Sequence, residues 1–346
     1  MNDFRNNNGF RIPDGNEWNY SPYGGINYQY RTALMHRENE KKSIKKLSFK
    51  TGLALILIQI LSFAAIMFLR MFGLSEMYNN DLLFSNAFTI MISLVCIFVP
   101  FFLISLSHDD GQKQRIFDFR APKTTKLFIT AVFAAFMLCL VANNISFFFS
   151  TLLEQVGFNS QTPQFPTPTQ GLPVFFYFLS VAVVPAFVEE FALRGVVMQP
   201  LRKYGDWFAI LVSAAVFALM HGNATQSFFA FLVGVVIGYF VIATNSIWTG
   251  VAIHFANNLF SVVFSVAAER SPDVTASIFN YIIAFLTLLG IVALIIFSLD
   301  KKRNKPAQVK TMLNNGQKLT SYVFTAPMVI SLLILFFSIV TYMVGV

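Results

Sequence analysis

Long stretches without a charged residue constrain this chain more than any other feature. Residues 207–268 contain no Asp, Glu, Lys or Arg over 62 positions. Further uncharged stretches of at least 19 residues occupy 51–69, 82–107, 127–153, 274–299 and 319–346. An α-helix needs about 20 apolar residues to cross the hydrocarbon core of a bilayer. The chain is therefore predicted to be an all-α, polytopic integral membrane protein.

The composition excludes several other classes of protein. Only 12% of the 346 residues are charged and 55% are hydrophobic, whereas soluble domains carry about 25% charged residues. An ordinary cytosolic enzyme, a nucleic-acid-binding domain and a disordered scaffold are all excluded by this deficit. Cys96 and Cys139 both lie inside apolar stretches, so no disulfide framework is expected.

The polar N-terminal segment differs from the rest of the chain. Residues 1–50 begin with an Asn-, Gly- and Tyr-rich stretch and end in a lysine-rich run over 41–50. This composition predicts a disordered cytoplasmic tail followed by a basic juxtamembrane segment. Residues 51–345 are expected to form one multi-span transmembrane domain, in which 187–258 carries the candidate catalytic motifs.

Nine spans are predicted, of which eight form a core and the ninth is an addition. They cover roughly 52–72, 85–106, 127–150, 172–200, 207–221, 227–243, 247–267, 276–299 and 323–345. With the N-terminus inside, the inside loops hold nearly all Lys and Arg, and the outside segments hold only Arg70 and Arg270. The positive-inside rule thus predicts a multi-pass protein of the cell membrane with a cytoplasmic N-terminus and an external C-terminus.

A few polar residues interrupt the spans between 172 and 267. Charges inside a bilayer cost at least ~2.5–3.5 kcal/mol each at mid-helix, so they are functional candidates. They fall into three short motifs, Glu-Glu-x-x-x-Arg, Phe-x-x-x-His and His-x-x-x-Asn. The motif residues are Glu189, Glu190 and Arg194; Phe217 and His221; His254 and Asn258.

Helical spacing assigns different roles to the two glutamates. Glu190 and Arg194 are four residues apart, so they share a helix face and can form an ion pair. Glu189 is turned about 100° away. We therefore interpret Glu190 and Arg194 as a structural brace and Glu189 as the reactive carboxylate. The alternative is that this ion pair only stabilises the helix and does not belong to a reaction site.

The number of residues between a side chain and the nearest turn predicts its depth in the bilayer. Glu190 and His221 lie 15 and 16 residues from Gly205, which places both about 22–24 Å from that turn. His254 follows the turn at 244–246 by only about eight residues, or roughly 12 Å. His254 is level with the other two only if its helix is tilted or starts deep.

Together these groups have the chemistry of an amide hydrolase. A carboxylate beside an imidazole can hold and deprotonate a water molecule, and a second imidazole with a carboxamide can donate to an oxyanion. Other intramembrane protease chemistries lack their residues. The predicted spans contain no Asp, and the sequence contains neither a Gly-x-Ser-x-Gly nor a His-Glu-x-x-His motif.

The three motifs in this order resemble the CAAX prenyl endopeptidase family, whose bacterial branch is called CPBP (CAAX proteases and bacteriocin-processing enzymes) or Abi. The resemblance covers about 170–267. It implies an eight-helix core with a site open to the cytoplasmic side. It also implies that Glu189 and His221 activate water and that His254 and Asn258 stabilise the oxyanion, with Glu190, Arg194 and Phe217 in support.

The resemblance leaves the metal and the substrate open. The family is often labelled a metalloprotease, and a metal-free glutamate mechanism has also been argued for it. If zinc is present, Glu189, His221 and His254 are its expected ligands; we favour metal-free catalysis, because a carboxylate and an imidazole suffice to activate water. The expected partners are the lipid bilayer and a membrane-associated protein or peptide substrate, with no nucleic acid.

Two readings outside catalysis use the same buried residues. A proton- or ion-coupled transporter would relay charge through Glu, His and Arg, although no inverted repeat is found in the sequence. A membrane scaffold would keep the fold and bind partners without catalysis. One experiment distinguishes these two hypotheses from an intramembrane endopeptidase. Only the endopeptidase would cleave a peptide and lose this activity when Glu189 is replaced.

Overall fold

The computed structural model describes residues 28–158 and 166–344, and every regular element in these ranges is a helix. Eight continuous helical stretches are long and apolar enough to cross a membrane, and they correspond to eight of the nine predicted spans. They are α1 (Tyr28–Met71), α3–η1–α4 (Leu82–Ile92, Ser93–Phe98, Val99–Leu106), α6 (Thr125–Gln155), α7–η2–α8–η3–α9–η4 (Gly171–Phe178, Leu179–Val183, Val184–Glu190, Phe191–Met198, Gln199–Leu201, Arg202–Tyr204), α11 (Ala224–Thr244), α12 (Ile247–Arg270), α13 (Pro272–Leu299) and α15 (Ala326–Val344).

The predicted fifth span is shorter than the others. It is α10 (Asp206–Leu219), an apolar helix of 14 residues. Short helices join the long ones at the ends of the bundle, namely α2 (Ser75–Asn80), α5 (Asp110–Ile116) and α14 (Asn315–Val323). The predicted all-α architecture is confirmed.

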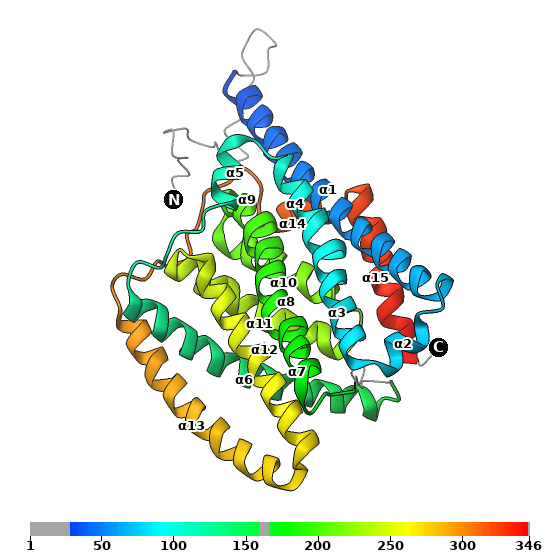
Figure 1. Cartoon of the computed structure of the whole chain (residues 1–346). Coiled ribbons are helices and arrows are strands. Elements are labelled where there is room, and N and C mark those ends of the chain that lie inside the picture. The colour runs from blue at the N-terminus through cyan, green and yellow to red at the C-terminus, as the bar shows by residue number, and fades with distance from the viewer. Residues whose placement is uncertain (1–27, 159–165, 345–346) are drawn as a thin grey trace.

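The long helices form a central group and two edges (Figure 1). At one edge α1 packs against α15, and at the other α6 packs against α13. Between them lie α8, α10, α11 and α12. The motif residues lie on α8, η3 and α12, and on α10 or directly after its end. In the centre, a Cβ on Gly234 of α11 would come within 3.0 Å of Ala214 on α10, so a small residue is needed for this close helix crossing.

Prolines explain three π-helical segments in the spans. η1, η2 and η3 each end two residues before a proline, at Pro100, Pro185 and Pro200. Proline has no N–H, and its ring collides with the carbonyl four residues earlier in an α-helix. Widening the helix over that carbonyl relieves the collision, and such π-bulges are frequent at functional sites. Two of the three segments flank α8 and its glutamates.

The expectation of a disordered tail over 1–50 is wrong for residues 28–50, which form the first half of α1. No Pro or Gly lies between 26 and 51, so nothing in this stretch breaks a helix. Tertiary contacts hold it in place: Glu40 accepts a hydrogen bond from the Met312 backbone N–H at 2.8 Å, and Ser48 bonds to the Tyr322 carbonyl. Residues 1–27 lie outside the described ranges.

Loops that the positive-inside rule places on one side of the membrane do lie together. Hydrogen bonds join the first half of α1 and the loops around 107–124, 201–206 and 300–314 to one another. The pairs are Lys50 with Ser107, Lys203 with Ser43, Lys123 with Asn304, and Asp206 with Ala307. The basic loops thus share one end of the bundle, and their cytoplasmic location stays a prediction.

Candidate active site

Glu190 and Arg194 form a fully buried ion pair. Arg194 Nη1 lies 2.7 Å from Glu190 Oε1, and both side chains are 0% exposed. The second arm of the guanidinium donates to the Gly234 carbonyl of α11 at 3.1 Å. The predicted pair is therefore present, and it also ties the fourth span to α11.

His254 lies between the two glutamates. Its Nδ1 is 3.0 Å from Glu190 Oε1, and its Nε2 is 3.7 Å from Glu189 Oε2. Glu190 is thus shared by Arg194 and His254, whereas Glu189 keeps 17% of its side chain exposed. This difference agrees with the division of the pair into a brace and an accessible carboxylate.

Phe217 packs against three of the motif residues. Its ring lies edge-on to His221 at 4.8 Å and to His254 at 5.8 Å, and the Arg194 guanidinium lies 5.3 Å from its centroid. A cation near an aromatic ring is attracted by the ring quadrupole. The Phe-x-x-x-His motif therefore joins both histidines and the arginine through one aromatic side chain.

The end of α10 fixes the tautomer of His221. His221 Nδ1 is 2.9 Å from the Phe217 carbonyl oxygen, four residues earlier. Because a carbonyl only accepts hydrogen bonds, Nδ1 must carry the proton. Phe217 lies in the last turn of α10, where carbonyls lack helical partners. In a neutral ring, Nε2 then keeps its lone pair and can accept a proton.

Asn258 has a partner inside the protein. Its Nδ2 donates to the Val181 carbonyl at 2.9 Å, and its Oδ1 accepts from Asn257 at 3.1 Å. In a regular α-helix the Val181 carbonyl would pair with the N–H of residue 185, which is Pro185 and has none. Asn258 thus satisfies a carbonyl freed by a proline, with its second N–H left over for another acceptor.

The position of the turn before α12 explains how His254 comes level with the glutamates. Thr244 and Ser246 are 0% and 3% exposed, and Asn304 hydrogen-bonds to the carbonyls of Ile242 and Ala243. α12 therefore starts inside the protein, beneath the loop after α13. The sequence could not place this start, because the covering loop lies about 60 residues further along the chain.

Gly250 is a site residue that motif analysis missed. A Cβ at this position would lie 2.6 Å from Glu190 Oε2 and 2.8 Å from Val241 Cγ2. Only glycine leaves room for the buried carboxylate. A signal was present in the sequence, because Gly250 precedes His254 by four residues and so shares its helix face.

The motif residues are not all brought into contact. The contacts described above join six of them, which we call the polar cluster: Glu189, Glu190, Arg194, Phe217, His221 and His254. Asn258 instead bonds to η2. The 3.7 Å contact of Glu189 is with His254 rather than with His221, its expected partner.

The proposed zinc ligands do not form a three-donor site. In residues 28–158 and 166–344, no group of three or more His, Cys, Asp or Glu side chains is placed to hold a metal ion. His254 has both ring nitrogens near carboxylates, and His221 uses Nδ1 on a backbone carbonyl. The donors present therefore do not fit a zinc ion in this arrangement.

Comparison with known families supports the resemblance drawn from the motifs. Residues 171–260 match the family described as type II CAAX prenyl endopeptidase Rce1-like. The match shows that this region of the chain is similar to that family. The matched region contains all seven motif residues and Gly250, so the polar cluster lies within the part of this multi-pass membrane protein that is similar to CAAX-type proteases. No curated protein and no solved structure matches the chain.

Proposed function

We propose that this protein is an intramembrane endopeptidase that hydrolyses a peptide bond of a membrane-associated protein or peptide. The observation that carries the proposal is the environment of Glu189. It is a partly exposed carboxylate inside a membrane domain, 3.7 Å from an imidazole that a second, fully buried carboxylate holds. A carboxylate in such a position can accept the proton of an attacking water.

His221 is proposed to assist Glu189 in activating the water. Its Nδ1–H donates to the Phe217 carbonyl, so Nε2 of the neutral ring is an acceptor. The proton taken from water can then pass to the leaving amine when the tetrahedral intermediate breaks down. A water between Glu189 and His221 would be the nucleophile.

His254 is proposed to stabilise the oxyanion together with Asn258. Its Nδ1 lies 3.0 Å from Glu190 Oε1, which holds the ring in place. Its Nε2 lies 3.7 Å from Glu189 Oε2, beyond hydrogen-bond distance, so an N–H at this position could donate to an oxyanion. Asn258 has one N–H beyond the one donated to Val181. Donors fixed in advance at the developing negative charge typically give the largest single catalytic effect.

Cleavage of a peptide tests the proposal. Purified protein in proteoliposomes is expected to cleave members of a fluorogenic peptide library, prenylated and unprenylated, and mass spectrometry identifies the new termini. Glu189→Ala should be inactive, while Glu269→Ala, at an exposed position near the end of α12, should match the wild type. If no peptide is cleaved and the protein instead moves protons or ions across the vesicle, the transporter reading replaces ours.

Chelation tests the metal-free form of the proposal. Activity should survive dialysis against a strong chelator, because the structure offers no three-donor ligand set in the described ranges. Metal content is measured in the same samples. Stoichiometric zinc that restores a chelated, inactive sample would contradict this and assign Glu189, His221 and His254 as ligands.

A further inference from the structure

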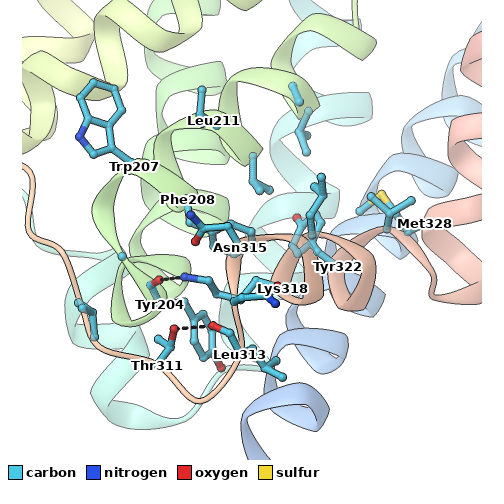
Figure 2. A pocket seen from close by; sticks show the side chains of 18 of the residues that line it. Tyr204, Trp207, Phe208, Leu211, Thr311, Leu313, Asn315, Lys318, Tyr322 and Met328 are labelled. Atoms are coloured by element: carbon cyan, nitrogen blue, oxygen red, sulfur yellow. Dashed lines mark hydrogen bonds between the residues drawn. The ribbon is translucent and has the colours of Figure 1, made fainter. Parts of the chain in front are cut away.

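A cavity lies away from the polar cluster, at the end of the bundle where the basic loops gather. It has a volume of about 780 Å³ and is bounded by α10, the segment 307–314, α14 and the start of α15 (Figure 2). Cavities that bind small ligands usually measure about 300–1,000 Å³. This pocket contains none of the motif residues.

The long walls of the pocket are apolar. On one side stand Leu211, Ala215 and Leu219, spaced by four residues and therefore on one face of α10. On the other side stand Met328 and Leu332 of α15. A bound peptide backbone would need hydrogen-bonding partners along its length, and these five side chains offer none, so the walls suit a hydrocarbon chain.

One end of the pocket carries a positive charge. Lys318 is the single charged residue among those that line it, and the side chain is buried, with 5% of the residue exposed. Its ammonium donates to the Tyr204 carbonyl at 2.9 Å and lies 5.5 Å from the centroid of Phe208 (Figure 2). Burial lowers the pKa of Lys318, and an anion beside it would favour the charged form. An ammonium has three donors, so two remain for such an anion.

Some of the apolar side chains that line the pocket are exposed at the protein surface. Trp207, Leu211 and Leu319 line it and are 45%, 46% and 51% exposed. Tryptophan is enriched where membrane proteins meet the headgroup region, and Trp207 is the second residue of the short helix α10. A molecule entering here from the bilayer would have its polar end near Lys318 and its tail along α10.

We propose that this pocket binds one acyl chain of an anionic membrane phospholipid, with the phosphate headgroup at Lys318. The apolar walls and the single cation at one end match the two parts of such a lipid, and no carboxylate lines the pocket to repel it. The site is separate from the polar cluster, so it does not depend on the proposed peptidase activity.

Native mass spectrometry of the delipidated full-length protein tests the site. Phosphatidylglycerol is added in one series and phosphatidylcholine with the same acyl chains in another. The wild type should retain one phosphatidylglycerol at least 10-fold more strongly than phosphatidylcholine. Lys318→Met should remove most of this preference, and Ala215→Trp should weaken retention of both lipids by filling the pocket.

Two control variants carry similar substitutions outside the pocket. Lys301→Met removes an exposed loop charge, and Leu288→Trp alters a side chain 65% exposed on α13; both should bind like the wild type. Circular dichroism and size-exclusion chromatography confirm folding, and Leu219→Phe replaces Ala215→Trp if the latter does not fold. Equal retention of both lipids, equal losses in the control variants, or displacement of the lipid by inorganic phosphate alone would overturn the proposal.

Discussion

The two halves of the polar cluster differ in environment although their glutamates are neighbours in sequence. In the closed half, Glu190 and Arg194 are 0% exposed and bond to each other, to His254 and to α11. In the open half, Glu189 is 17% exposed and His221 is partly buried. Each half suits a different task, since a buried pair holds geometry and an accessible carboxylate can meet water.

This difference in environment explains why the protein contains buried charges that are costly to desolvate. A buried ion pair contributes little net stability, because desolvation offsets the attraction. Glu190 and Arg194 nevertheless position His254, and His254 lies beside Glu189. We therefore expect the closed half to matter mainly for stability when one partner is lost, and the open half mainly for turnover.

Loss of the arginine should give the largest effect in the closed half. Arg194→Ala leaves Glu190 buried without its countercharge, which typically costs about 3–5 kcal/mol. Low yield and a reduced melting temperature are expected together with lost activity. Arg70→Ala, at an exposed position at the end of α1, serves as the control. A stable but inactive Arg194→Ala would move the arginine from the brace to substrate contact.

Loss of the asparagine tests the proposed contact between Asn258 and the oxyanion. If Asn258 donates to the oxyanion, Asn258→Ala should lower turnover by about 10²–10³. The control is Asn86→Ala, because Asn86 also bridges two helices through a hydrogen bond, at 2.7 Å with Ser180. Similar losses of stability with similar turnover in the two variants would show that Asn258 only bridges helices.

A single methyl group tests how tightly the closed half is packed. Gly250→Ala places a Cβ 2.6 Å from Glu190 Oε2, and overpacking of this kind typically costs about 1–3 kcal/mol. Thermal unfolding measures the cost. Gly111→Ala in α5, where a Cβ meets only the Asp109 side chain at 3.6 Å, should be neutral. An equally neutral Gly250→Ala would show that the cluster can rearrange without penalty.

The sequence predicted the helices because hydropathy is a local property. The uncharged stretches gave the spans, and i,i+4 spacing gave the Glu190–Arg194 pair. It failed where distant segments decide the structure: residues 28–50 are held as a helix by contacts near 312 and 322. The deep start of α12 depends on Asn304. Gly250 was missed because glycine carries no chemistry of its own, and its importance lies in the space it leaves.

The division between the two glutamates is tested most directly by changing each to glutamine and measuring turnover and melting temperature in one set of proteoliposomes. Glutamine keeps the shape and removes only the charge. Glu189→Gln should fall to background turnover with an unchanged melting temperature, whereas Glu190→Gln should lower the melting temperature, because Arg194 loses its countercharge. A Glu189→Gln enzyme that cleaves at nearly the wild-type rate would contradict the account.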